Sequence, residues 1–163
     1  MTSSGAGAKS EDLHTPHELV REVTDKMLKV IRNNQKTLEE QPQQFYSDVQ
    51  AVLDPVVDFR FIAYGVMGSY VKKANPKQRK LFISKFKEGL VSTYAKGMAG
   101  FGDRQIVVLP PKGNIGNRKT VSVVQEVKGD DGVNRVSYTM KKNRESEWKL
   151  INVVLNGVNL GKV

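Results

Sequence analysis

The chain has 163 residues, of which 39% are hydrophobic and 26% are charged, and it contains no cysteine. This length is sufficient for one domain with its own core, and the lack of cysteine excludes disulfides, thiolate nucleophiles and cysteine-ligated metals. The net charge of +9 is the sum of +4 in residues 1–100 and +5 in residues 101–163. The positive charge is therefore not confined to one basic tail.

The first 14 residues are predicted to form a disordered leader, because they are small and polar. They lack the apolar segment of a signal peptide, and no other stretch approaches the roughly 18 to 20 apolar residues of a membrane span. The protein is therefore either cytosolic or the mature form of an exported protein with a new initiator Met. We expect one domain over residues 15–163.

Two helices are predicted before residue 55. The segment Thr15-Pro16-His17-Glu18 has the pattern of a capping box with proline at the first helical position. An apolar stripe follows it as far as Leu38. A second, shorter helix can start at Pro42, and Asp54-Pro55 ends it.

Two more helices are predicted between residues 58 and 98. Asp58 can cap a third helix, whose apolar stripe runs from Phe59 to Tyr70. Asn75-Pro76 opens the fourth helix, which glycines 97, 100 and 102 end. Its stripe consists of apolar residues four apart, namely Phe82, Phe86, Leu90, Tyr94 and Met98.

From Arg104 onwards the apolar period changes to two, which is typical of strands. Strands are predicted at Ile106–Leu109, Val121–Lys128, Val136–Met140 and Trp148–Leu155, with Asp131-Gly132 as a hairpin turn between the middle two. The last strand is apolar on both faces, with Trp148, Leu150 and Val154 on one and Ile151, Val153 and Leu155 on the other. The prediction is an α+β fold in which four N-terminal helices pack against a curved antiparallel sheet of about four strands.

No catalytic, metal or cofactor site is expected. The only histidines, His14 and His17, are expected on the surface near a helix start, and no carboxylates complete a metal site. No serine lies in a Gly-x-Ser-x-Gly turn, and the glycine-rich segment 113–116 does not precede a helix as a phosphate-binding loop does. The adjacent Asp130 and Asp131 are predicted turn residues.

Three segments together resemble the MlaC-type proteins, also called the toluene-tolerance auxiliary family. They are VDFRFIA (57–63) with VMGSY (66–70), then ANPKQRKLF (74–82) with Phe86, Leu90, Thr93 and Tyr94, and finally WKLINV (148–153) with NGVNL (156–160). The resemblance covers roughly residues 17 to 163.

This resemblance implies a monomeric periplasmic carrier that takes phospholipid between an outer-membrane lipoprotein complex and an inner-membrane ABC transporter complex. The acyl chains would lie in a pocket between helices and sheet, with phospholipid as cargo and no cofactor. It further implies that a signal peptide has been removed, and that the helical tail which usually follows the family's Asn-Leu exit is missing after Val163.

The candidate lining residues are those expected to point inward on each predicted helix or strand. Several are Met or Tyr, which suit a flexible apolar cargo. They are Leu53, Val56, Phe59, Val66, Met67, Tyr70, Phe86, Leu90, Tyr94, Met98, Val121, Val123, Tyr138, Met140, Leu150 and Val153. A plain hydrophobic core is the alternative. The basic run Lys72, Lys73, Lys77, Arg79 and Lys80 is the candidate contact for acidic partners or lipid headgroups, the alternative being a solvated face.

Two other functions remain open at this point. A nucleic-acid-binding module would need stacking aromatics among the basic residues, and the face Arg135, Ser137, Thr139 and Lys141 has none. A small enzyme of cone-shaped α+β fold would need an inward Asp or His, and here only tyrosines are expected in the pocket.

Overall fold

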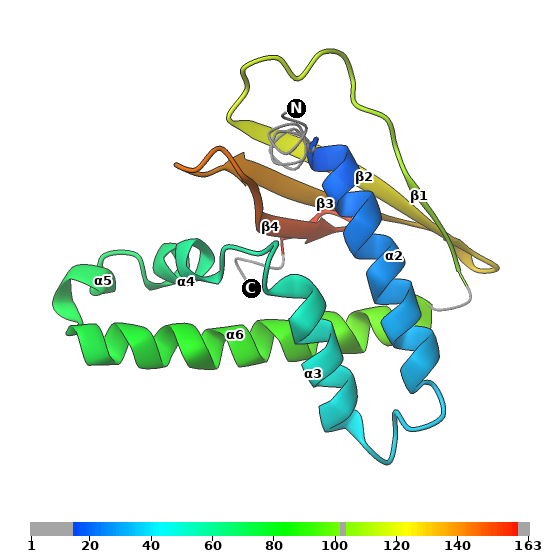
Figure 1. The fold of residues 1–163 in the computed structure, drawn as a ribbon, viewed down its shortest axis with the longest axis horizontal. Coiled ribbons are helices and arrows are strands. Elements are labelled where there is room, and N and C mark those ends of the chain that lie inside the picture. Colours follow the sequence, from blue (N-terminus) through cyan, green and yellow to red (C-terminus); the bar gives the residue numbers. More distant parts are fainter. Residues whose placement is uncertain (1–14, 102–103, 160–163) are drawn as a thin grey trace, which may run out of the picture.

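The computed structural model of the protein describes residues 15–101 and 104–159. Helices come first and an antiparallel sheet follows, and the helices cover one face of that sheet (Figure 1). The expected α+β class is thus confirmed, with one more short helix and one more short strand than predicted. The leader, His14 and the end of the chain after Asn159 lie outside the described residues. Within the described ranges, no helix is long and apolar enough to span a bilayer.

The first helix, α2 (Pro16–Asn34), begins at the predicted capping box. The Thr15 hydroxyl accepts a hydrogen bond from the Glu18 N–H at 3.1 Å, and the Glu18 carboxylate accepts one from the Thr15 N–H at 3.4 Å. The next helix, α3 (Pro42–Leu53), begins with its predicted proline and packs against α2. Local sequence therefore determines where both helices begin.

The third predicted helix is interrupted. The Asp58 carboxylate caps α4 (Phe59–Met67) as expected, but the helix ends at Gly68, whose φ of 57° is one that glycine adopts without strain. One further turn, α5 (Tyr70–Lys73), follows at a new angle (Figure 1). The expectation of one continuous helix through Tyr70 is therefore wrong, and the apolar stripe does not continue across Gly68.

The longest helix, α6 (Pro76–Met98), begins at a second capping box and leads into a single 3₁₀ turn, η1 (Ala99–Phe101). The Asn75 side chain accepts a hydrogen bond from the Gln78 N–H at 2.8 Å, and the Gln78 side chain accepts one from the Asn75 N–H at 2.9 Å. α6 runs beneath the sheet and contacts both α3 and α4 (Figure 1).

The sheet is a meander in which each strand pairs with its neighbours in sequence. The strands are β1 (Gln105–Val108), β2 (Thr120–Gly129), β3 (Gly132–Lys142), β4 (Trp148–Leu155) and β5 (Val158–Asn159). The predicted hairpin joins β2 to β3, and Gly132 at its end has a φ of 126°, which favours glycine. The fifth strand was not predicted because two residues carry no periodic signal.

The expected division of β4 into two faces is wrong, because a β-bulge changes which of its residues share a face. Thr139 of β3 pairs with Asn152, and the next residue, Met140, pairs with Leu150, so Ile151 is left unpaired. An extra residue shifts the alternation by one. Leu150 and Val153 therefore both lie opposite residues of the covered face, although simple alternation places them on opposite faces.

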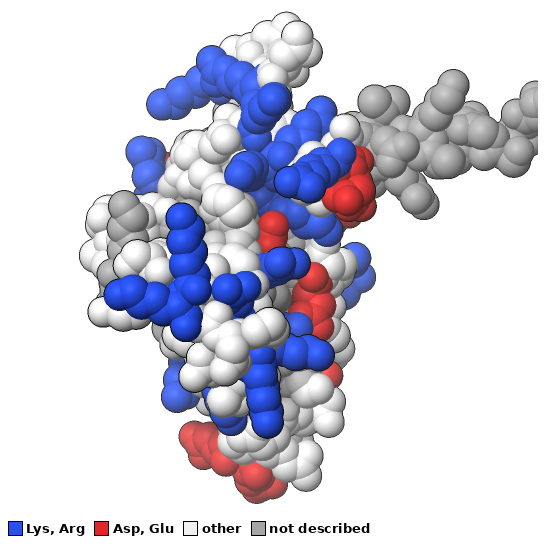
Figure 2. Space-filling view, turned by 90° about the vertical axis from the view of Figure 1, so that its left-hand side faces the viewer, with Lys and Arg blue, Asp and Glu red and all other residues white. Residues whose placement is uncertain are grey.

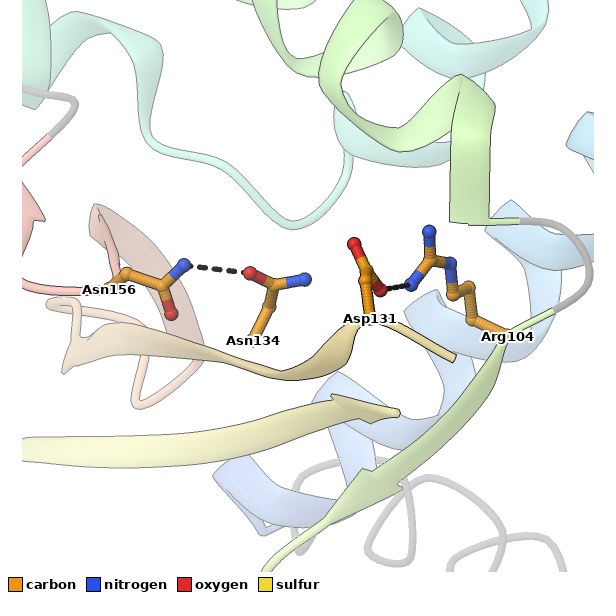
Figure 3. Close-up of polar contacts among 4 residues, drawn as sticks. All are labelled: Arg104, Asp131, Asn134 and Asn156. Atoms are coloured by element: carbon orange, nitrogen blue, oxygen red, sulfur yellow. Dashed lines mark hydrogen bonds and ion pairs between the residues drawn. The ribbon is translucent and has the colours of Figure 1, made fainter. Parts of the chain in front are cut away.

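Two polar contacts fasten this end of the sheet (Figure 3). An Arg104 Nη1 donates to Asp131 Oδ1 at 2.6 Å and ties β1 to the β2–β3 turn, and this contact lowers the pKa of the exposed Asp131 carboxyl. The Asn156 amide donates to Asn134 Oδ1 at 2.8 Å and ties the turn between β4 and β5 to β3. A Cβ at Gly129 would overlap the Arg104 side chain, which would have to move to admit it.

Candidate ligand-binding cavity

A cavity of about 350 Å³ lies between the helices and the covered face of the sheet. This volume is within the usual range for small-molecule sites. The cavity is lined by Val20, Val23, Thr24, Leu53, Val56, Val57, Phe59, Ile62, Phe86, Gly89, Leu90, Thr93, Tyr94, Tyr138, Met140, Leu150, Asn152 and Val153. The lining is mostly aliphatic and aromatic, and it includes no Asp, Glu, His, Lys or Arg.

The helix α6 separates its apolar residues between two faces. Val91 and Ala95 are fully buried in the packed core. Phe86, Leu90 and Tyr94 line the cavity and are only half-buried. The structure therefore contains both a packed core and a cavity beside it. The four-residue spacing of Phe86, Leu90 and Tyr94 places these three side chains along the cavity wall.

Ten of the sixteen sequence-predicted residues are brought together at the cavity. They are Leu53, Val56, Phe59, Phe86, Leu90, Tyr94, Tyr138, Met140, Leu150 and Val153. Their role in binding a lipid is a proposal.

The other six predicted residues do not line the cavity. Val66 and Tyr70 are 50% and 66% exposed, and Met67 is half-buried at the end of α4. The buried residues of α4 are Phe59, Ile62 and Ala63, so burial is confined to the first part of this helix. Met98, Val121 and Val123 are buried elsewhere, so there they are ordinary core residues.

Sequence reasoning missed eight residues of the cavity wall: Val20, Val23, Thr24, Val57, Ile62, Gly89, Thr93 and Asn152. Val20, Val23 and Ile62 lie on the predicted apolar stripes. These stripes indicated that the residues are buried, but not that they line a cavity. Gly89 carried no signal as a single residue, and Thr93 was noted only as part of the family resemblance. They lie four apart on α6, the spacing of neighbours on one helix face.

A buried polar chain forms one wall of the cavity. The Tyr138 hydroxyl donates to Gln125 Oε1 at 3.1 Å, and Gln125 Nε2 donates to Thr24 Oγ1 at 2.6 Å. The Thr24 hydroxyl in turn donates to the Val20 carbonyl at 2.7 Å. The chain thus connects β3 and β2 to α2, and its buried polar groups are paired, as burial requires.

Tyr94 extends this chain beyond Tyr138, and both tyrosines line the cavity. The two tyrosine hydroxyl oxygens are 3.4 Å apart, and Tyr138 already gives its single proton to Gln125, so Tyr94 must be the donor. Burial raises the pKa of Tyr94 and raises that of Tyr138 well above its ordinary value. Both hydroxyls therefore stay neutral at neutral pH, and the wall carries no charge.

The cavity reaches the surface beside α6. Gly89 and Thr93 line the cavity and are themselves exposed, and a Cβ added at Gly89 would meet no atom within 4 Å. Glycine inside a helix costs roughly 0.5–1 kcal/mol relative to alanine. At this position it leaves open space beside the cavity.

The chemistry of the lining favours binding over catalysis. A pocket enzyme needs an acid, a base or a nucleophile that is activated by one, and the lining offers only uncharged hydroxyls and one amide. His17, expected on the surface, is buried in α2 outside the lining, and burial lowers its pKa. Within the described ranges, no three His, Asp or Glu residues are placed to hold a metal ion.

The family model of the MlaC protein matches residues 21–163. The chain belongs to the MlaC family. It is 34% identical over 151 residues to the toluene tolerance protein ttg2D of Pseudomonas putida, covering 91% of this chain and 69% of the relative. It is 25% identical over 149 residues to a Haemophilus influenzae relative, covering 90% and 69% of the two chains. That relative is named intermembrane phospholipid transport system binding protein MlaC.

The family fold is also found in a solved structure. A phospholipid-binding protein from Ralstonia solanacearum, solved in complex with a phospholipid, matches with a TM-score of 0.80 and 21% identity. The match covers 91% of this chain and 82% of the other. At this identity it shows a shared fold, and the family membership inferred from the three sequence segments is confirmed by the family match.

Proposed function

We propose that this MlaC-family protein is a periplasmic phospholipid carrier that holds acyl chains in the cavity between its helices and its sheet. The observation that carries the proposal is an apolar, partly open cavity without a charged side chain in its lining. The relatives named for phospholipid transport and the phospholipid complex of the similar fold support it. No catalytic group and no cofactor are required.

The hydrophobic effect explains why a carrier needs only to shield the acyl chains from water. Exposing apolar surface costs about 0.8 kcal/mol per CH₂, so an acyl chain of about 15 such groups costs on the order of 12 kcal/mol in water. A cavity that shields these groups removes most of that barrier and forms no covalent bond. The phosphate headgroup can stay at the opening beside α6, in contact with water, because burying an unpaired charge would be costly.

The proposed partners follow from the family. A monomeric carrier would collect phospholipid from one membrane complex and deliver it to another, between an outer-membrane lipoprotein complex and an inner-membrane ABC transporter. The ten predicted residues at the cavity and the eight that prediction missed form the proposed acyl-chain site. Carrier and partners would meet in the periplasm, after removal of a signal peptide.

Native mass spectrometry of protein purified from a bacterial periplasm tests the proposal. We expect a complex one phospholipid heavier than the chain, and denaturation should release a diacyl phospholipid in stoichiometric amount. Release would identify the headgroup and the number of chains together. A clean apo mass from protein exported to the periplasm would contradict the proposal and leave the cavity as a packing defect.

Substituting Gly89 with leucine should close the opening. We expect Gly89→Leu to slow the exchange of a fluorescent phospholipid with vesicles at least fivefold, because the new side chain occupies the space beside the cavity. Gly97→Leu is the matched control, since Gly97 is also an exposed glycine of α6 with open space around it but does not line the cavity. Both changes favour helix, so equal exchange rates in the two variants would place the opening elsewhere.

A further inference from the structure

Exposed apolar side chains concentrate at one end of the molecule. Within the described ranges, the exposed large hydrophobic residues are Phe61, Val66, Tyr70, Leu81, Val133 and Val158. The first four lie within residues 59–84, which form α4, α5 and the start of α6; we call this segment the helical tip. Phe61 is 43% exposed and Tyr70 is 66% exposed. Soluble proteins rarely gather such residues without a binding partner.

The helical tip is also purely cationic in its charged residues. Residues 59–84 contain Arg60, Lys72, Lys73, Lys77, Arg79 and Lys80, and they contain no Asp or Glu. In the described part of the chain, none of these six forms an ion pair. The next two lysines differ, because Lys85 and Lys87 pair with Glu88 and Asp54. Figure 2 looks onto this end and shows blue side chains spread over it.

Local contacts hold the tip in a fixed shape. Arg79 Nε donates to the Val71 carbonyl at 2.7 Å, which fastens α5 to α6. Lys73 Nζ lies 5.5 Å from the centre of the Tyr70 ring, and Lys141 Nζ of β3 lies 4.2 Å from the centre of the Phe61 ring. Cationic and aromatic side chains therefore lie next to one another on the surface of the tip. Arg79 is half-buried and positions the tip, while Lys72, Lys77 and Lys80 are exposed.

The tip adjoins the cavity through α4. Phe59 and Ile62 line the cavity, and Phe61 between them is exposed on the tip. The part of the tip around Phe61 is therefore within one helical turn of residues that line the cavity. This continuity gives the exposed Val66 and Tyr70, which do not line the cavity, a role outside it.

We propose that the helical tip docks this carrier on the surface of an anionic phospholipid bilayer, an inference that rests on the proposed function. Unpaired cations attract the anionic headgroups, and aromatic or aliphatic side chains among them can enter the interfacial layer. A nucleic acid would use the charge but not the aliphatic residues Val66 and Leu81. Apolar side chains that project from several short helical segments at one end of the molecule suit a fluid surface, which adapts to each of them.

Vesicle flotation with the full chain tests this docking. We expect binding to vesicles of phosphatidylglycerol and phosphatidylethanolamine, weaker binding to phosphatidylcholine vesicles, and loss of binding as salt screens the charges. The triple variant Lys72→Glu, Lys77→Glu, Lys80→Glu should bind the anionic vesicles at least tenfold more weakly. Phe61→Ser with Tyr70→Ser should lower the binding that persists at high salt.

The matched control changes the same number of charges elsewhere. Lys112, Arg118 and Lys119 are exposed in the loop between β1 and β2, and the triple Glu variant there should change vesicle binding less than twofold. Equal losses in both triple variants would reduce the effect to net charge and overturn the proposal. Wild-type protein that binds an acidic peptide but not anionic vesicles would also overturn it, in favour of an acidic protein surface.

The lipid content of the same samples separates this proposal from the carrier function. Wild-type protein that binds vesicles but releases no phospholipid on denaturation would support docking and contradict the carrier. Protein that releases phospholipid but ignores anionic vesicles would contradict docking alone.

Discussion

Replacing Leu90 with aspartate should empty the cavity while leaving the protein folded. Leu90 lines the cavity from α6 and is only half-buried, so a carboxylate there is solvated in the empty protein. Bound acyl chains would strip that solvent, which costs at least about 3 kcal/mol. Since about 1.4 kcal/mol is a factor of ten, we expect phospholipid affinity at pH 7.5 to fall at least hundredfold. Native mass spectrometry after loading with phospholipid measures it.

Val133→Asp provides the control for Leu90→Asp. Val133 is 57% exposed on β3 and lies outside both the cavity lining and the helical tip. We expect this variant to retain phospholipid like the wild type, and far-UV circular dichroism should show both variants folded. A folded Leu90→Asp protein with unchanged lipid content would mean that the cargo does not lie against α6.

Helix starts were predictable from the sequence because their signals are local. The capping residues Thr15, Asp58 and Asn75 all act where they were expected to. The hairpin between β2 and β3 was found for the same reason, since its glycine needs a positive φ whatever surrounds it. In each case, a few neighbouring residues settle the conformation.

The register between strands and the position of the cavity were less predictable from the sequence. The bulge at Ile151 depends on how β4 meets β3, and no pattern within β4 reveals it. Residues of a core and of a cavity wall have the same apolar phase, so Met98 and Leu90 could not be told apart on one helix. They differ in what faces them: Met98 meets packed side chains, and Leu90 meets an empty volume.

The buried Gln125 is a residue that no pattern in the sequence singled out. It lies within an otherwise apolar alternation on β2, yet it is fully buried and accepts a hydrogen bond from the Tyr138 hydroxyl. An aliphatic residue there would remove the acceptor of the Tyr138 hydroxyl and the donor to Thr24, and would leave Tyr138 only its 3.4 Å contact with Tyr94. We infer that the polar chain fixes α2 against the sheet and so keeps one wall of the cavity in place.

Replacing Gln125 with leucine should therefore destabilise the protein. An unsatisfied buried donor costs about 1–3 kcal/mol, and for a domain of this size Tm should fall by about 2–4 °C for each kcal/mol. Urea denaturation and calorimetry measure both quantities. Gln105→Leu is the matched control, because Gln105 is exposed at the start of β1, and its effect should stay within about 0.5 kcal/mol.

Gln125→Glu tests the same network through pH. A protonated carboxyl can accept from Tyr138 and donate to Thr24, as the amide does, whereas a carboxylate cannot donate. Burial should raise the pKa of the introduced group above its unfolded value of about 4.3. Its stabilisation is then complete below that unfolded value and is lost as pH rises through the folded pKa. The stability of the variant relative to wild type should therefore fall between pH 5 and pH 8. A difference that does not change with pH would mean that the carboxyl has left the network, and that the cavity wall forms without it.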